Sequence, residues 1–235
     1  MTDPSSRPSG QFPTTAWEQL RDAQERNHFL ARYWKPVFVF LRAKGRSPQA
    51  AEELTQEFFL RLLEKDWLRQ ADPTRGKFRT YLLTILVRFL ADQTPQRMPR
   101  QKAFEQQLTS LEGLIGDEDR AWQPPTNETP EILFMRQWAR DLLKDVDRRL
   151  KNLCAQKGWA AWYDVCEARA GTGGKPPTQQ QLAERFGLTR DEVRSALDKV
   201  PQWCQVLLRA EVRRHVGSED EVDDEVRDIL ELLGE

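Results

Sequence analysis

The sequence is poor in several residue types that mark particular protein classes. It has three cysteines, two histidines and three tyrosines among 235 residues. The three cysteines, Cys154, Cys166 and Cys204, are odd in number and widely spaced, which argues against a disulfide framework and fits a reducing cytoplasm. No apolar run approaches the roughly 20 residues that cross a bilayer, and the polar first residues lack the apolar stretch of a secretory signal. We therefore expect a soluble, cytoplasmic protein without a membrane segment.

Groups of residues that serve catalysis or bind cofactors are also scarce. The two histidines, His28 and His215, are far apart, and we expect each to lie on the surface. The cysteines lack the spacing of metal ligands, and no GxxxxGK segment is present to cradle a phosphate. We expect no enzyme activity, no catalytic residue, no metal site and no cofactor.

Charge is distributed unevenly along the chain. The net charge of −1 hides an acidic end, because residues 218–235 contain nine acids and one base, so that the 217 residues before them carry +7. Residues 30–105 contain fifteen bases and eight acids, which is again +7. A basic surface there would attract a polyanion by releasing condensed counterions. An ordinary solvated helical surface explains the same count equally well.

Apolar residues recur at helical spacing, and the alternation typical of strands is nearly absent. We predict an all-α fold whose helices begin at capping signals such as Ser47-Pro48 and Thr129-Pro130. Pro36 predicts either a kink or a helix start within the first apolar stripe. The predicted buried stripes of the first three helices are Leu30, Tyr33, Trp34, Val37, Phe38 and Leu41; Ala51, Leu54, Phe58 and Leu62; and Phe78, Leu82, Ile85, Leu86 and Phe89.

Changes in composition divide the chain into two helical modules and their connections. The helical pattern weakens where glycine and proline accumulate after residue 100, which indicates a linker. The predicted segments are a disordered tail over 1–24, a basic helical domain over 25–100, a linker over 101–129, a helical domain over 130–217 that includes a helix-turn-helix at 178–200, and an acidic helix or tail over 218–235.

The most specific local motif is the segment TQQQLAERFGLTRDEVRSAL. Thr178 and Thr189 each stand three residues before a Gln or Glu, the pattern of a capping box, and Gly187 lies where a tight turn needs a positive φ. This arrangement predicts a DNA-binding helix-turn-helix whose second helix enters the major groove. The competing interpretation is an ordinary helical hairpin, which the three bases and three acids of residues 189–199 favour.

Taken in order, the basic helices, the linker and the helix-turn-helix resemble a bacterial RNA polymerase sigma factor of the extracytoplasmic-function type. AEELTQEFFLRLL is similar to the family's polymerase-binding helix, and KFRTYLLTILVRFLADQ to the segment that grips the minus-ten promoter element. TQQQLAERFGLTRDEVRSAL resembles the module that reads the minus-thirty-five element. The middle stretch PEILFMRQWARDLLKDVDRRL and the acidic end resemble a long-tailed, planctomycete-like subgroup.

The chain also departs from the family pattern at three places. Tyr81 stands where many relatives have Trp, and Arg88 stands where Asn is common. After Leu197 the family usually continues with several bases, whereas this chain has few, and Pro201 predicts a break in the helix.

The resemblance implies a sigma factor that binds core RNA polymerase and directs promoter recognition and DNA melting, with an anti-sigma protein as a further candidate partner. It also implies three sets of binding residues. The polymerase-binding set is Glu52, Glu53, Gln56, Glu57 and Arg61. The minus-ten set is Lys77, Arg79, Tyr81, Arg88, Gln93 and Arg97. The set on the recognition helix is Thr189, Arg190, Arg194, Ser195 and Lys199.

Two other functions remain open at this point. One is a helix-turn-helix transcription regulator that acts without polymerase, and the other is a sigma-like interaction scaffold that no longer reads promoters. The role of the acidic end is also open, because its apolar residues fall on one face of an amphipathic helix. This helix either caps the last helix of the domain, which we favour, or folds over the basic surface and limits DNA binding by the free protein. The apolar residues are Val222, Val226, Ile229, Leu230 and Leu233.

Overall fold

The structure is a computed structural model that describes residues 23–65, 67, 77–92, 114–171, 175–216 and 218–234, with side chains from Leu30 onward. All regular secondary structure within these ranges is helical, which confirms the predicted fold class. Residues 1–22 of the predicted tail and 101–113 of the predicted linker lie outside them. The helices are α2 (Ala23–Ala43), α3 (Pro48–Glu64), α4 (Phe78–Ala91), α6 (Asp117–Ala121), α7 (Pro130–Gln156), α8 (Ala160–Ala170), α9 (Gln179–Phe186), α10 (Arg190–Arg213) and α11 (Glu221–Leu233).

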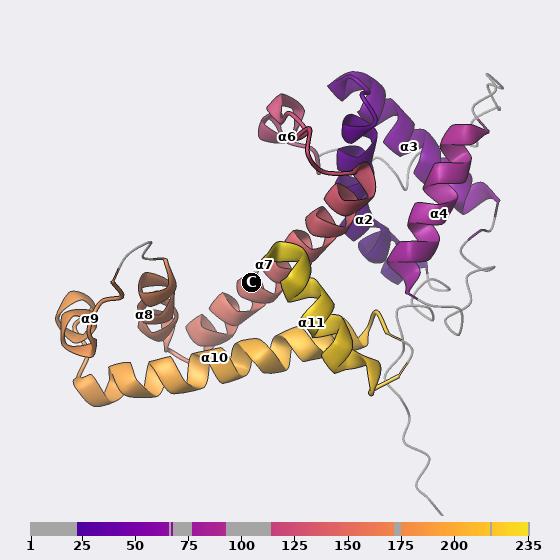
Figure 1. Ribbon diagram of the computed structural model, residues 1–235. Helices are drawn as coiled ribbons and strands as arrows, with labels where there is room; N and C mark the ends of the chain where they lie inside the picture. The colour runs from indigo at the N-terminus through magenta and orange to yellow at the C-terminus, as the bar shows by residue number, and fades with distance from the viewer. Residues whose placement is uncertain are drawn as a thin grey trace, which may run out of the picture.

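Helices α2, α3 and α4 form a bundle around aromatic side chains (Figure 1). The three predicted stripes point into this core, with Leu54 alone only partly buried. Trp34 stacks on Phe59 with ring centroids 5.0 Å apart, and Phe58 meets the edge of Phe89 at 5.5 Å. Such offset and edge-to-face pairs are the favoured aromatic geometries and add to the stabilisation from apolar burial.

Helix starts follow the predicted caps. The Ser47 side chain accepts a hydrogen bond from the backbone N–H of Ala50 at 3.2 Å, and Pro48 is the first helical residue of α3. Thr129 caps α7 in the same way through Ile132, at 3.3 Å. These caps satisfy backbone donors that the first turn of a helix leaves free.

Two prolines lie inside helices instead of ending them. Pro36 is within α2, so of the kink or helix start expected there, the helix start is excluded. Pro201 is within α10, so the helix break expected there is wrong. A proline removes one backbone hydrogen bond and crowds the preceding turn. Tertiary burial of a neighbouring residue outweighs that local cost, since Val200, next to Pro201, is 2% exposed, and Val37, next to Pro36, is fully buried.

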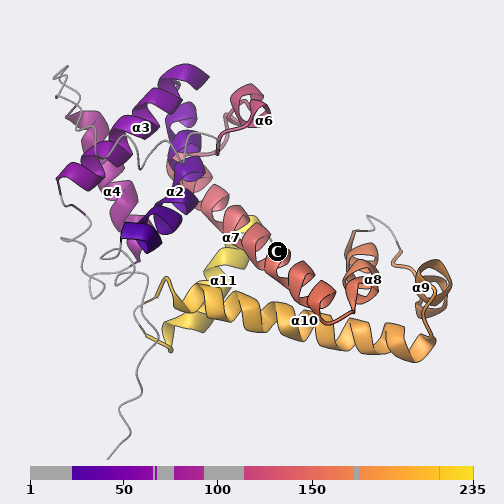
Figure 2. The same ribbon diagram turned by 180° about the vertical axis from the view of Figure 1, so that it is seen from behind.

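The long helices α7 and α10 connect the bundle to the rest of the molecule. Helix α7 extends from the bundle toward α8, and α10 returns from α9 toward α11, as both views show (Figures 1 and 2). The main core therefore combines α2–α4 with Phe134 and Trp138 of α7, Val212 of α10, and Ile229 of α11. Residues on both sides of the predicted linker share one core.

Two smaller apolar clusters hold the outer end of the molecule. Helices α8, α9 and the start of α10 bury Val165, Leu182 and Val193. Leu150 of α7 and Val200 of α10 belong to a second cluster that joins this end to α7. The position of α9 and the start of α10 is thus fixed relative to α7 by packing and not only by chain connectivity.

Candidate functional site

The predicted polymerase-binding residues lie on α3, and all five keep some exposure to solvent. Glu53 is exposed, and its carboxylate accepts a hydrogen bond from Gln49 at 3.1 Å on the same helix. Glu57 pairs with Arg61 at 2.6 Å, and the Arg61 guanidinium also lies 5.1 Å from the centre of the Phe89 ring. The side chains therefore form a polar ridge along α3, in which Glu57 and Arg61 are the charge pair within the helix.

A short helix contacts one end of this ridge. Arg120 of α6 donates to Glu52 at 2.6 Å, and Asp119 pairs with Lys35 of α2 at 2.5 Å. Sequence reasoning missed α6, which lies inside the predicted linker and has five residues. The run Asp117-Glu118-Asp119 was the available signal, because acids favour the first turn of a helix.

The two basic residues at the start of α4 are covered by the acidic helix α11. Lys77 forms ion pairs with Glu225 and Asp228. Arg79 is only 6% exposed and pairs with Glu225 through both guanidinium nitrogens, one of them at 3.0 Å. The two predicted DNA contacts at this position are therefore occupied by carboxylates in this structure.

Aromatic packing holds Arg79 in place. Its guanidinium lies 4.5 Å from the centre of the Trp138 ring of α7, a geometry that favours a cation over the ring face. Burial lowers the pKa of Arg79, while the nearby Tyr33 and Asp228 oppose that shift. The spacing held a signal for this burial, since Arg79 precedes the buried Leu82 and Leu86 by three and seven residues.

The other residues of the minus-ten set are placed differently. Arg88 is exposed on α4, on the same face as the exposed Thr84. Tyr81 is half-buried, its hydroxyl donates to the backbone carbonyl of Trp67 at 2.7 Å, and burial raises its pKa. Gln93 and Arg97 lie outside the described residues.

Helix α9 and the start of α10, joined by a turn at Gly187, occupy the segment predicted as a helix-turn-helix. Both capping boxes are present, at Thr178 with Gln181 and at Thr189 with Glu192. Gly187 ends α9 with φ +65°, and a side-chain carbon there would meet nothing within 4 Å. The glycine is therefore required by backbone conformation and not by lack of space.

The basic side chains on the exposed face of this segment all have contacts within the protein. Arg190 donates to Gln180 of α9, and Arg194 pairs with Asp191 at 2.7 Å. Lys199 is exposed, and its ammonium lies 5.7 Å from the centre of the Trp162 ring. Thr189 is used as the helix cap, and Ser195 is half-buried. At the start of α10, Arg194 is thus paired with a carboxylate, whereas Arg190 is held by a neutral amide.

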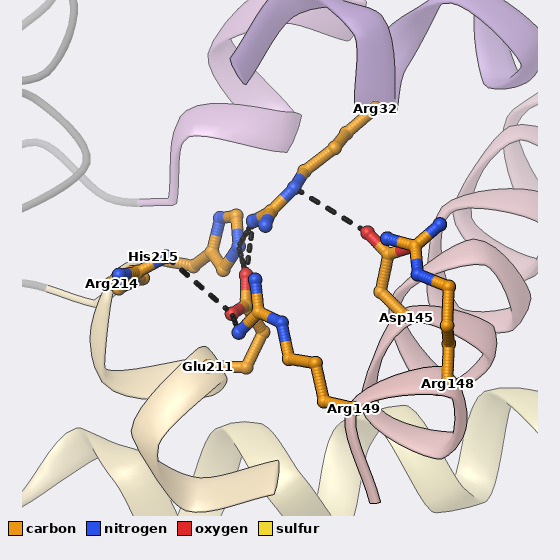
Figure 3. A network of polar contacts seen from close by, with 7 residues as sticks. All are labelled: Arg32, Asp145, Arg148, Arg149, Glu211, Arg214 and His215. Carbon is orange, nitrogen blue, oxygen red and sulfur yellow. Dashed lines mark hydrogen bonds and ion pairs between the residues drawn. The ribbon is translucent and has the colours of Figure 1, made fainter. Parts of the chain in front are cut away.

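A buried carboxylate joins α2, α7 and α10 (Figure 3). Glu211 of α10 is fully buried and pairs with Arg32 of α2 and, at 2.6 Å, with Arg149 of α7. Arg214 approaches the same carboxylate at 3.7 Å. Arg32 also reaches Asp145 of α7 at 3.8 Å. The cluster therefore fixes α2 against α7 and α10.

His215 belongs to this cluster and is 3% exposed, so its predicted surface position is wrong. Arg32 lies 3.2 Å from Nε2 of His215. Nε2 also lies 3.6 Å from the carboxylate of Glu211, so this nitrogen faces a donor on one side and an acceptor on the other. The edge of the ring also contacts Trp138, with centroids 5.6 Å apart. This packing draws His215 inward.

Burial and charge shift the pKa values of this cluster. Burial alone would raise the pKa of Glu211, but His215, Arg32 and Arg149 together lower it far below its usual range. Burial lowers the pKa of His215, and Arg32 and Arg79 act in the same direction against the opposing effect of Glu211. At neutral pH the cluster therefore holds an ionised carboxylate and a neutral imidazole.

The described parts of the chain were also compared with the requirements of a metal site, a disulfide and a membrane-spanning helix. No group of three or more His, Cys, Asp or Glu side chains there is arranged to hold a metal ion. The three cysteines are free thiols. None of the described helices combines the length and apolar character that a membrane crossing requires.

One comparison with known proteins bears on this arrangement. Residues 29–96 match the family described as Sigma-70 region 2. This range lies inside the predicted basic domain 25–100 and contains α3 and α4 with their polar faces. No curated protein and no solved structure matches the chain.

The match supports the assignment of this chain as an RNA polymerase sigma factor, with a role in polymerase binding and promoter recognition. It covers the predicted polymerase-binding set and the predicted minus-ten set except Arg97, and it leaves the predicted helix-turn-helix outside. Sigma factors are not an enzyme family.

Proposed function

We propose that this chain is a sigma factor of the extracytoplasmic-function type, related to the long-tailed, planctomycete-like subgroup, that acts in the cytoplasm and opens promoter DNA. The observation that supports the proposal is the Sigma-70 region 2 match over residues 29–96, a range that includes the polar ridge of α3 and the exposed face of α4. Residues 25–100 dock on polymerase and hold the minus-ten element, and residues 130–217 carry the minus-thirty-five reader.

Docking uses the ridge on α3. Glu53 and Glu57 retain exposed carboxylate surface, and the core aromatics beneath them fix the direction of the helix. A rigid row of acidic side chains favours a basic helical partner, because complementary charge steers association and sets the register. By resemblance, that partner is the coiled coil of the largest polymerase subunit.

Promoter opening uses α4. Unstacking a base costs a few kcal/mol, and stacking a base on an aromatic side chain returns about 1–3 kcal/mol. Tyr81 offers a half-buried ring on the same helix as the exposed Arg88, which can neutralise a phosphate of the captured strand. Together they provide a ring for base stacking and a charge for phosphate binding on one helix.

The helix-turn-helix adds a second DNA contact. The pairing of Arg194 with Asp191, and the equal numbers of basic and acidic residues in 189–199, imply weak binding by this motif alone. Polymerase holds both modules, so the second contact is made at a high effective concentration and needs little affinity of its own.

The test is reconstitution with core RNA polymerase. The full chain is expected to co-elute with core enzyme and to support promoter-dependent transcription. Glu53→Arg, an exposed position on α3, should weaken co-elution strongly. Glu167→Arg, an exposed position on α8, is the control with the same change of charge and should leave co-elution intact. Failure of the wild-type chain to bind core enzyme would overturn the proposal.

A second candidate is a sigma-like scaffold that binds polymerase without reading promoters. It is favoured by the neutral start of α10, where Arg194 is paired with Asp191. The same reconstitution separates the two functions, since a scaffold co-elutes with core enzyme but does not support transcription. A regulator that acts without polymerase would instead bind an operator alone and ignore core enzyme.

A further inference from the structure

Helix α11 is anchored along its apolar side to the rest of the molecule. Val222 and Ile229 are fully buried in the main core. Arg136 of α7 donates to the carbonyl of Leu232 at 2.7 Å, and Arg209 of α10 pairs with Asp223. In both views α11 lies against α7 and α10 (Figures 1 and 2). The acidic end is therefore a docked element with a fixed orientation.

Docking turns two of its carboxylates onto the start of α4. Glu225 is fully buried and receives both Arg79 and Lys77. Asp228, which is 47% exposed, pairs with Lys77 and lies 3.8 Å from Arg79. The two basic side chains of the minus-ten set at the start of α4, Lys77 and Arg79, are thus neutralised by one helix.

A carboxylate and a phosphate form the same kind of charge-assisted hydrogen bond with the side chains of Lys77 and Arg79. Both present anionic oxygens to a guanidinium fork and to an ammonium group. A phosphate that replaces Glu225 or Asp228 restores the charge pairing that the displaced helix removes. The exchange therefore leaves no buried charge unpaired, which is the main cost of breaking such a pair.

We propose that α11 is an intramolecular competitor of DNA, which occupies Lys77 and Arg79 in the free protein and must leave before these residues contact a promoter strand. This inference rests on the proposed function, since it assigns the covered surface to DNA. It changes the favoured expectation for the acidic end, because α11 covers the basic surface as well as capping α10.

The experiment compares two aspartates of α11 in the full-length chain. Asp228→Asn removes a carboxylate that pairs with Lys77, whereas Asp224→Asn removes one that pairs with Arg227 of the same helix. Both changes remove one negative charge from α11. The probe is a labelled DNA duplex of mixed sequence with an unpaired bubble, titrated with free protein at low salt and followed by fluorescence anisotropy.

Asp228→Asn is expected to tighten DNA binding about 2- to 5-fold, as for the loss of one partly exposed ion pair. If Lys77 then contacts a phosphate, the dependence of log affinity on log salt steepens by about 0.9. Asp224→Asn should change neither quantity to this extent. The gain from Asp228→Asn should disappear when Lys77 is also changed to Ala.

Glu225→Gln is the second variant, and it should tighten binding more than Asp228→Asn because Glu225 pairs with both bases. Equal effects of Asp228→Asn and Asp224→Asn, or no effect of either, would overturn the inference. Such a result would leave the proposed function standing if the chain still co-elutes with core polymerase. Loss of co-elution in the wild-type chain is the separate result that overturns the proposed function.

Discussion

Arg79 of α4 and Glu225 of α11 form a buried, two-point ion pair although they are 146 residues apart in the chain. The Trp138 ring of α7 covers the guanidinium on one side. Neither charge has much access to water, so each depends on the other for its stabilisation. The start of α4 and the end of the chain therefore fold as one unit.

Breaking this pair from one side should be costly. Arg79→Met is expected to lower the free energy of unfolding by about 3 kcal/mol, because the buried Glu225 loses its two-point partner and keeps Lys77, which is itself 30% exposed. Chemical denaturation of the full chain measures the change. The double variant Arg79→Met with Glu225→Leu should lose less than the sum of the two single variants. Strict additivity of the two losses would contradict the pair's role.

The Glu211 cluster predicts a second large effect on stability. Glu211→Gln removes the charge that balances Arg32 and Arg149, and should cost about 3–5 kcal/mol. Glu167→Gln, on the exposed face of α8, should stay within about 0.5 kcal/mol of the wild type. Urea unfolding of both variants is the measurement. Similar midpoints for the two would show that Glu211 does not hold the helices together.

His215 predicts a loss of stability on acidification. Its folded-state pKa is lowered, so the unfolded chain takes up a proton at a higher pH than the folded chain. Because the unfolded state binds more protons, the free energy of unfolding falls as pH drops below about 6.5, the usual value for histidine. The depressed pKa of Glu211 continues the same trend at lower pH.

The variant His215→Gln checks this assignment, since Gln offers an acceptor to Arg32 but does not titrate. Unfolding is measured between about pH 7.5 and 5.5, where His215 dominates the expected slope. The variant should show a flatter dependence on pH than the wild type over this range. An unchanged slope would assign the effect to other groups.

Gly187 predicts a smaller, local effect. Gly187→Ala keeps open space around the new carbon but forces a left-handed conformation, at a cost of about 1 kcal/mol. Gly187→Asn should cost less, because Asn tolerates this region. Hydrogen exchange of backbone amides in α9 and α10 is the readout. Equal protection in the alanine and asparagine variants would contradict the conformational explanation.

Local features of this fold could be predicted because local chemistry decides them. The caps at Ser47 and Thr189 and the left-handed Gly187 depend on residues within one turn. The apolar stripes of α2 and α4 were also predictable, because a helix buries residues at its own period. The persistence of helix through Pro201 was not, because it depends on packing against distant helices.

Contacts between distant segments could not be predicted from the sequence for the same reason. Glu211 and Arg79 both fall on the inward side of amphipathic helices, yet the sequence does not say which charge each would meet. The pairing of Lys77 with α11 requires the fold that brings residues 77 and 225 together. The candidate site was therefore predicted as a set of residues, while its covered state emerged from the structure.

The central claim is that the α4 face holds melted promoter DNA after the chain has joined core polymerase. Permanganate reactivity of thymines at the minus-ten element tests it most directly, with purified core enzyme, the full chain and a promoter from the same organism. We predict reactive thymines only when core enzyme and protein are both present. Arg88→Ala should reduce this reactivity while co-elution with core enzyme is retained. Thymines that stay unreactive with the wild-type holoenzyme, or react equally with Arg88→Ala, would contradict the account.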